Sequence, residues 1–471
     1  GKVEKIARTG GYASNTITVS GSTVSSTKDL IYIPEIDKWA LLFHDSSSGE
    51  HKTTIGTQAT DGTITWGTAV KVENVEQNRD GSRMVYDPNV SRLLVVAKMD
   101  NGSGKAQTYS ISGTSLTKTA ESNFEASGVN VSFNNAMNLH YHAASNKIIC
   151  FYTLDSGGVP TVKVFTLGAS TISVSSSQGP GNYSSGGGTV AGFGSNSLNM
   201  VFGISSVGST IVFAYKMTNF KAIAATISGT TLTFGSDIDL SSNTPDTTQA
   251  GLGKCIYLSG SSTANKFAAF FNYGNEYVAY NFTVSGTTLT YVDSANSGAV
   301  EGSGVPAVGY DPTNDKGYVA WVQSNNFRAK VGDVVDSFWT TSGYTNVGSA
   351  SGEIINGAYN PDLDWFTFIN SESKYGYFYP QSDNYYYFVG CALEAASANT
   401  TVKIANAGTI ATGLSGLTAG NGYRIIYTGN FQSQGSFLTD KSILNQTQRA
   451  GMSGLALTTT TMLILNDFMH L

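Results

Sequence analysis

Charged residues are scarce in this chain of 471 residues, of which only 13% are Asp, Glu, Lys or Arg, and the formal net charge is −6 at pH 7. Such a chain lacks the basic face that nucleic-acid binding needs, so we expect no nucleic-acid partner. Runs of about 18 apolar residues are also absent, so we expect no insertion into a membrane. The first residues contain no apolar segment of the signal-peptide kind.

Cysteine is rare as well. The three cysteines, Cys150, Cys255 and Cys391, lie far apart in sequence, each in or beside an apolar run. An odd number in a large chain does not indicate a disulfide framework, so we expect buried free thiols. The alternative is one bridge and one reactive thiol.

Motifs for nucleotide and acyl chemistry are missing, including the dinucleotide-binding Gly-x-Gly-x-x-Gly, the phosphate-binding Gly-Lys-Ser/Thr loop and the Gly-x-Ser-x-Gly elbow. Only five histidines occur. His140 and His142 alternate along one expected strand, where they would either bind a metal with a third ligand or serve a structural, solvent-facing role. Because no Cys/His/Asp cluster lies nearby, we favour the second role and expect no metal and no cofactor.

The sequence does contain a repeat. Each copy is an apolar strand ending in an aromatic residue, a tight turn such as Asp87-Pro88, and a second, almost wholly apolar strand. The leading aromatic residues recur at intervals of about fifty residues, which in an all-β chain is typical of a β-propeller. They are Tyr32, Tyr86, Tyr141, Phe202, Tyr257, Tyr310 and Tyr359.

Seven copies predict seven blades of four strands. Residues 14–24 alternate β-branched and polar side chains like the last hairpin of other units, and the seventh unit has no fourth strand of its own. We therefore expect the N-terminal strand to complete the last blade, which removes an exposed sheet edge. The predicted propeller covers residues 1–381, and a small β-rich trimerisation module covers residues 382–471.

Three segments of that module carry a family resemblance: 388–392 (Phe-Val-Gly-Cys-Ala), 413–423 (Gly-Leu-Ser-Gly-Leu-Thr-Ala-Gly-Asn-Gly-Tyr) and 454–464 (Gly-Leu-Ala-Leu to Ile). Their order resembles the C-terminal module of bacteriophage tail-fibre proteins. Ala419 stands where Pro is common, and residues 431–449 separate the last two motifs, so the match departs in two places. The resemblance implies a virion surface protein, often trimeric, that recognises a receptor.

Catalysis is not predicted. The segment from Gln58 to Trp66 looks like the structural aspartate-box turn of sialidase propellers, but a sialidase also needs three converging arginines and a Tyr–Glu pair. The propeller region offers only Arg8, Arg79, Arg83, Arg92 and Arg328. A glycosidase pair such as Glu35 or Asp37 with Asp362 or Asp364 would use turn positions, where Asp commonly caps its own backbone. We assign no catalytic residue.

Aromatic side chains are the remaining candidates for ligand binding, because their faces stack on sugar C–H groups. Most aromatic residues of a propeller belong to the core between blades, so each candidate is weighed against that role. The candidates lie in the late blades and are Trp321, Trp339, Tyr344, Trp365, Tyr375 and Tyr377.

The sequence is interpreted as a non-enzymatic tail-fibre or receptor-binding protein of a phage virion. Its expected partners are a bacterial surface receptor, either a polysaccharide or an outer-surface protein, and other virion tail proteins. It would act as a homotrimer, gaining avidity from repeated weak sites. The alternatives are a purely structural virion protein and a polysaccharide-degrading propeller enzyme, between which the fold does not decide.

Overall fold

A computed structural model gives the fold of the chain. It describes residues 12–72, 82–127, 129–130, 137–154, 160–179, 202–216, 220–240, 254–259, 265–273, 276–296, 306–313, 315–334, 344–352, 354–363 and 365–378, and short strands between 391 and 464. By their internal contacts the residues form two compact units, Gly11–Pro380 and a second unit that joins Gly1–Gly10 with Gln381–Leu471.

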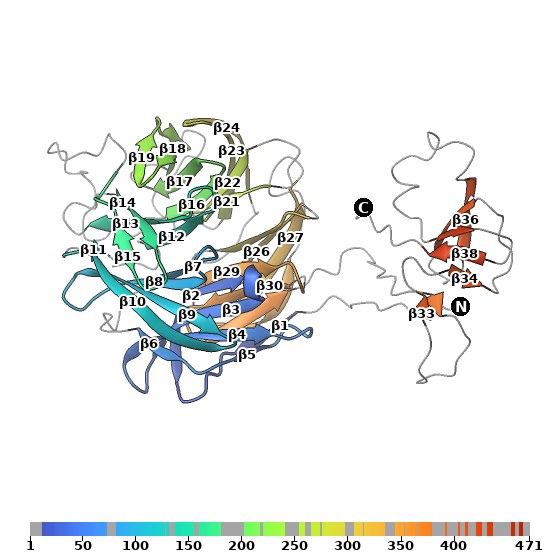
Figure 1. Ribbon diagram of the computed structural model, residues 1–471, viewed down its shortest axis with the longest axis horizontal. Coiled ribbons are helices and arrows are strands. Elements are labelled where there is room, and N and C mark those ends of the chain that lie inside the picture. The colour runs from blue at the N-terminus through green and yellow to red at the C-terminus, as the bar shows by residue number, and fades with distance from the viewer. Residues whose placement is uncertain are drawn as a thin grey trace. The chain divides into compact units, whose positions relative to one another are not determined.

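The larger unit is a seven-bladed β-propeller, as the repeat predicted, with the inner strands around a common centre (Figure 1). Blades 1 to 3 are β2 (Val24–Ile33), β3 (Lys38–Asp45), β4 (Glu50–Gln58), β5 (Ile64–Trp66) and β6 (Val70–Val72); β7 (Ser82–Asp87), β8 (Arg92–Lys98), β9 (Gly104–Ser112) and β10 (Ser115–Glu125); and β11 (Val129–Asn130), β12 (Met137–His142), β13 (Lys147–Leu154), β14 (Pro160–Leu167) and β15 (Ile172–Val174).

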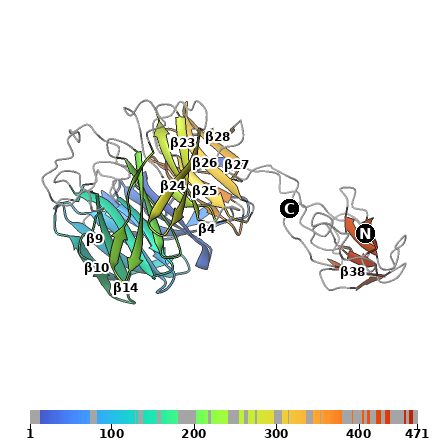
Figure 2. The same ribbon diagram turned by 90° about the horizontal axis from the view of Figure 1, so that it is seen from above.

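The later blades repeat this plan. They are β16 (Phe202–Val207), β17 (Thr210–Lys216), β18 (Phe220–Ser228), β19 (Thr231–Phe234) and β20 (Ile238–Asp239); β21 (Cys255–Tyr257), β22 (Lys266–Tyr273), β23 (Glu276–Ser285) and β24 (Thr288–Asn296); β25 (Ala307–Asp311), β26 (Lys316–Gln323), β27 (Asn326–Asp333) and β28 (Thr345–Ser349); and β29 (Ile354–Asn360), β30 (Trp365–Asn370) and β31 (Lys374–Phe378) with β1 (Tyr12–Thr16). Figure 2 shows the same blades from above.

The propeller closes through its N-terminal strand, as expected. β1 pairs antiparallel with β31, with Tyr12 opposite Phe378 and Thr16 opposite Lys374. The last blade therefore joins both ends of the propeller, and its outer edge is provided by β1.

The core lies between the blades. Among the described residues it divides into seven clusters, each shared by two successive blades. One cluster joins Trp39 and Phe43 of blade 1 to Trp365 and Ile369 of blade 7 and so completes the ring. The second strands are the most buried, because both of their faces pack on a neighbouring blade, and β30 is buried at every position.

The turn after each inner strand explains the repeat. The hydroxyl groups of Tyr141 and Tyr310 donate to Asn146 Oδ1 at 2.9 Å and Asp315 Oδ1 at 2.7 Å, each five residues further on. Both acceptors have a positive φ, 51° and 50°, which Asn and Asp tolerate better than most residues. The tyrosine thus fixes the turn that returns the chain to the second strand.

One leading residue was assigned wrongly. The residues equivalent to Tyr32 are set by pairing with the second strand, as in Tyr86 opposite Leu93 and Tyr141 opposite Ile148. In blade 4 this position is Ser206, opposite Ile211, whereas Phe202 lies at the start of β16. An aromatic residue at the right distance along the chain had the wrong register within the strand.

The smaller unit is also built from strands. They are β32 (Cys391–Ala392), β33 (Ile404–Ala405), β34 (Ile410–Thr412), β35 (Asn421–Ile425), β36 (Phe431–Ser436), β37 (Gly454–Ala456) and β38 (Thr461–Ile464). The last five form one sheet in the order β34-β38-β37-β35-β36. The trimerisation assigned to this unit stays a prediction. In the described part of both units, no helix is long and apolar enough to cross a membrane.

Candidate functional site in the central channel

The inner strands of all seven blades line a central cavity of about 590 Å³. Each inner strand pairs with one neighbour only, so its other edge is free. Every second backbone N–H and C=O group on that edge points away from the blade and toward the channel. A cavity of this size suits a small molecule, for which pockets of roughly 300–1,000 Å³ are usual.

A polar layer crosses the channel at one level of the strands. Its residues stand three positions before the conserved turn position of their blades, where Tyr32, Tyr86, Tyr141, Tyr257 and Tyr359 lie. They are Asp29, Arg83, Asn138, Lys254 and Asn356, and all five line the cavity. Blades 4 and 6 have Gly203 and Ala307 at this level.

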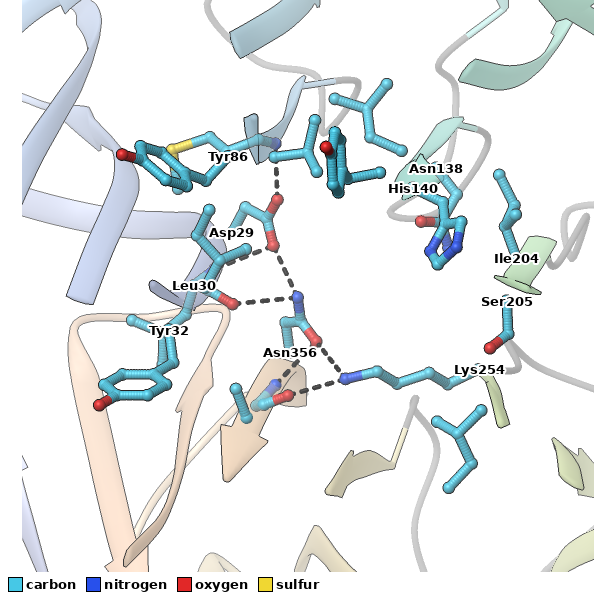
Figure 3. Close-up of a pocket in the computed structure, with 18 of the residues that line it drawn as sticks. Asp29, Leu30, Tyr32, Tyr86, Asn138, His140, Ile204, Ser205, Lys254 and Asn356 are labelled. Carbon is cyan, nitrogen blue, oxygen red and sulfur yellow. Dashed lines mark hydrogen bonds between the residues drawn. The ribbon is translucent and has the colours of Figure 1, made fainter. Parts of the chain in front are cut away.

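Lys254 extends across the channel from blade 5 to the last two blades (Figure 3). Its Nζ donates to Val308 O at 2.9 Å, Gly357 O at 2.8 Å and Asn356 Oδ1 at 3.2 Å. Burial lowers the pKa of Lys254 to about 8, while the negative charge of Asp29 acts in the opposite direction. Three acceptors match the three donors of an ammonium group, so Lys254 holds blades 5, 6 and 7 together.

Asn356 carries this network on to blades 1 and 2. Its Nδ2 donates to Asp29 Oδ1 at 2.7 Å, and Asp29 Oδ2 accepts from Met84 N at 2.8 Å. Asp29 Oδ1 also accepts from Leu30 N at 2.9 Å, and Asp29 is only 2% exposed. The chain of contacts from Lys254 through Asn356 to Asp29, called the axial relay below, satisfies its polar groups mutually (Figure 3).

His140 lies on another part of the channel wall, on β12 of blade 3. Its Nε2 is 2.7 Å from Ser206 Oγ on β16 of blade 4. Burial, with a smaller effect of the neighbouring His142, lowers the pKa of His140 to about 4, so the imidazole is neutral near pH 7. Among the described residues, Nδ1 has no hydrogen-bond partner. His140 is partly exposed to the cavity.

The two histidines considered together from sequence have different hydrogen-bond partners. His142 is fully buried, and its Nδ1 lies 2.7 Å from Ser145 Oγ of its own turn, away from the His140–Ser206 contact. In the described part of the chain, His, Cys, Asp and Glu side chains do not gather in threes as a metal would need. Cys150 and Cys255 are buried free thiols, as expected, and burial raises the pKa of each.

The aromatic candidates lie elsewhere. Trp321, Trp365, Tyr375 and Tyr377 are 2–6% exposed and belong to clusters between blades. Their rings therefore contact protein rather than solvent, which is the core role against which each was weighed. Trp339 lies outside the described residues. None of the described candidates lines the channel cavity.

Tyr344 is the exception, because its side chain is 53% exposed. The guanidinium carbon of Arg328 lies 4.4 Å from the centre of its ring, and Trp321 packs edge-on at 6.0 Å. Glycan binding at this position stays a prediction. The residues of the axial relay were missed from sequence, although they could be found by counting three positions back from each leading tyrosine.

Comparison with known proteins gives the fold but no family. No family model and no curated protein matches the chain. A solved protein from Lactobacillus plantarum is 15% identical, with a TM-score of 0.50, over 72% of this chain and 97% of its own length. A putative 6-phosphogluconolactonase from Bacteroides uniformis is 11% identical, with a TM-score of 0.50, over 70% and 89%. A periplasmic gluconolactonase from Pseudomonas aeruginosa is 14% identical over 73% and 98%, with a TM-score of 0.48.

These neighbours correct the functional interpretation. The chain was interpreted as a non-catalytic receptor-binding protein of a phage virion, whereas a similar structure with a functional name is a putative 6-phosphogluconolactonase. The interpretation failed because it rested on small-residue patterns in the last 90 or so residues, under a fifth of the chain, while the propeller itself carried no such signal. At 11–15% identity the similarity shows the seven-bladed fold alone.

Proposed function

We propose that this protein is a hydrolase that opens a small lactone in its central channel, with His140 as the proton acceptor. The observation that carries the proposal is a neutral, partly exposed imidazole on the wall of a cavity of about 590 Å³. The lactonase name of a similar propeller supports the reaction type.

Lactone hydrolysis needs few groups. A nucleophile must lose a proton as it attacks the carbonyl carbon, and the oxyanion that forms must be stabilised by hydrogen-bond donors. His140 can accept the proton because it is unprotonated at neutral pH. The free edges of the inner strands supply backbone N–H groups that are fixed in place before the substrate arrives.

The rest of the wall suits a polyhydroxylated ring. Asn138 lies on the same strand as His140, two residues earlier, and adds a polar side chain to the cavity lining. Tyr141 and Tyr257 add aromatic surface to the lining, on which the C–H face of a sugar ring can pack. We therefore expect sugar lactones to react better than aliphatic lactones.

The test is acid release from a panel of lactones, followed with a pH indicator. The panel contains glucono-δ-lactone, its 6-phosphate and an unsubstituted δ-lactone, each corrected for spontaneous hydrolysis. The wild type should accelerate opening of at least one sugar lactone, and His140→Gln should lower kcat/KM by about 10²–10⁴-fold, the usual contribution of a general base.

Val292→Thr is the matched control. Val292 lies on the outer strand β24, is 45% exposed and is outside the cavity lining, so this near-isosteric change should leave the rate unchanged. Acceleration that survives His140→Gln would remove His140 from the mechanism, and a wild type that accelerates no lactone would contradict the proposal.

A further inference from the structure

We infer that Ser206 is the nucleophile of this hydrolysis and forms a covalent acyl-enzyme, with His140 as its base. The inference rests on the proposed function and deepens it. Ser206 Oγ and His140 Nε2 are 2.7 Å apart, which is within the range for proton transfer between a nucleophile and its base.

The place of this pair in the repeat sets it apart from a chance surface contact. At three contacts between successive blades, the residue before the leading tyrosine in one blade packs in one cluster with the tyrosine of the next. Ile31 packs in one cluster with Tyr86, Val85 with Tyr141, and Ile256 with Tyr310. These contacts are apolar.

Between blades 3 and 4, both residues at these positions are polar instead of an aliphatic residue and a tyrosine. The register puts His140 where Ile31 and Val85 stand in their blades, and Ser206 where the others have tyrosine. The two replacements meet in a hydrogen bond. The serine is also smaller than the tyrosine that stands at this position in the other blades.

The cavity reaches His140 on β12 and, on β16, the two residues just before Ser206, Ile204 and Ser205. His140 and Ser205 line it, and Ser206 follows Ser205 on β16 and is partly exposed. The cavity side of the contact can therefore accept the carbonyl carbon of a bound lactone, while the ring lies in the channel.

The steps balance without any further reactant than water. Ser206 Oγ attacks the carbonyl carbon as its proton passes to His140 Nε2, giving a tetrahedral oxyanion. The bond from that carbon to the ring oxygen then breaks, and the ring oxygen takes the proton from His140, leaving a hydroxyacyl ester on Ser206. Water attacks the ester with His140 again as base, and Ser206 Oγ leaves with the proton, which releases the hydroxy acid.

The test is mass spectrometry of the full chain after acid quench during turnover. With the lactone that reacts best, we expect a covalent adduct with the mass of one lactone, and peptide mapping should place it on Ser206. Ser206→Ala should abolish the adduct and lower kcat by about 100-fold or more. Ser209→Ala, an exposed residue of the turn that follows β16, is the control and should keep both adduct and rate.

A second probe works without lactone turnover. A fluorophosphonate should label Ser206 in the wild type and not in His140→Gln, since the base activates the hydroxyl group. Lactone hydrolysis with no adduct, no labelling and an active Ser206→Ala would overturn the acyl-enzyme and leave the lactonase function standing, with water as nucleophile. If no lactone is opened, the function is wrong, and labelling of Ser206 alone then decides whether the pair is reactive.

Discussion

Two parts of the channel wall use the same positions of the repeat in opposite ways. On one side, Lys254, Asn356 and Asp29 form hydrogen bonds across blades 5, 7 and 1, and the Lys254 ammonium group donates to three acceptors. On the other side, His140 contacts Ser206 and keeps one ring nitrogen without a partner among the described residues. The first arrangement connects blades 5, 7 and 1. The second leaves a ring nitrogen of His140 to which a ligand can bind.

The difference follows from how many partners each polar group finds. A buried polar group with all of its hydrogen bonds made contributes to stability and has nothing left to offer a substrate. A propeller can therefore place the residues that join its blades and the residues that react with a substrate on different blades around one channel. Substitutions on the two sides should then separate stability from activity.

The largest loss of stability is expected for Asp29→Ala. The change leaves Met84 N and Leu30 N without their carboxylate acceptor and removes one of the two acceptors of Asn356 Nδ2, in a site where Asp29 is 2% exposed. Removing one partner from such a buried network costs about 3–5 kcal/mol of unfolding free energy. Urea unfolding followed by circular dichroism measures it, and a loss below about 1 kcal/mol would show that channel water replaces the carboxylate.

Lys254→Met tests the other end of the axial relay through the pH dependence of the unfolding free energy. The pKa of Lys254 is lowered from its ordinary 10.5 to about 8. Between these values only the unfolded chain keeps the proton, so raising the pH through this window favours the folded wild type. The variant has no such group. The difference in unfolding free energy, wild type minus variant, should therefore increase from pH 8 to about 10.5, and a constant difference would contradict the lowered pKa.

The tyrosine turns give a smaller effect with an internal control. Tyr141→Phe and Tyr310→Phe each remove a hydroxyl that bonds to its turn, at Asn146 and Asp315, and should cost about 0.5–1.5 kcal/mol. Tyr86 has no hydroxyl partner among the described residues, so Tyr86→Phe should be nearly neutral. Equal effects at all three positions would mean that the rings, rather than the hydroxyl groups, fix the turns.

The blades could be predicted from the sequence because their signals are local. The aromatic residue, the turn and the apolar second strand all lie within about 15 residues, and even the closure was visible as an unpaired strand at each end. The His140–Ser206 pair is of another kind. Its members are 66 residues apart, and they meet only because β12 and β16 are neighbours in a particular register.

The register of β16 in blade 4 was predicted wrongly from the sequence. Phe202 has the right spacing to lead blade 4, and its choice hid Ser206 as the one leading position without an aromatic ring. The described aromatic candidates lie outside the channel lining for a related reason. Trp321 and Trp365 are of the residue type found on sugar-binding surfaces. Strand alternation, however, directs both side chains into the core between blades.

A small effect on stability is expected at His140, where the effect on activity should be large. His140→Gln keeps a polar group within reach of Ser206 and removes no apolar packing partner, so at pH 7 it should change the unfolding free energy by less than about 1 kcal/mol. In acid, His140→Gln should increase the unfolding free energy relative to the wild type. The pKa of His140 is lowered from 6.5 to about 4, so between these values only the unfolded chain is protonated, and the wild type loses stability as the pH falls. The variant avoids this loss and should melt at a higher temperature than the wild type near pH 4.5, while its kcat/KM for lactones stays about 10²–10⁴-fold lower at pH 7. A variant that is strongly destabilised at pH 7 would place His140 with the axial relay as a structural residue, and the separation between the two sides of the channel would be wrong.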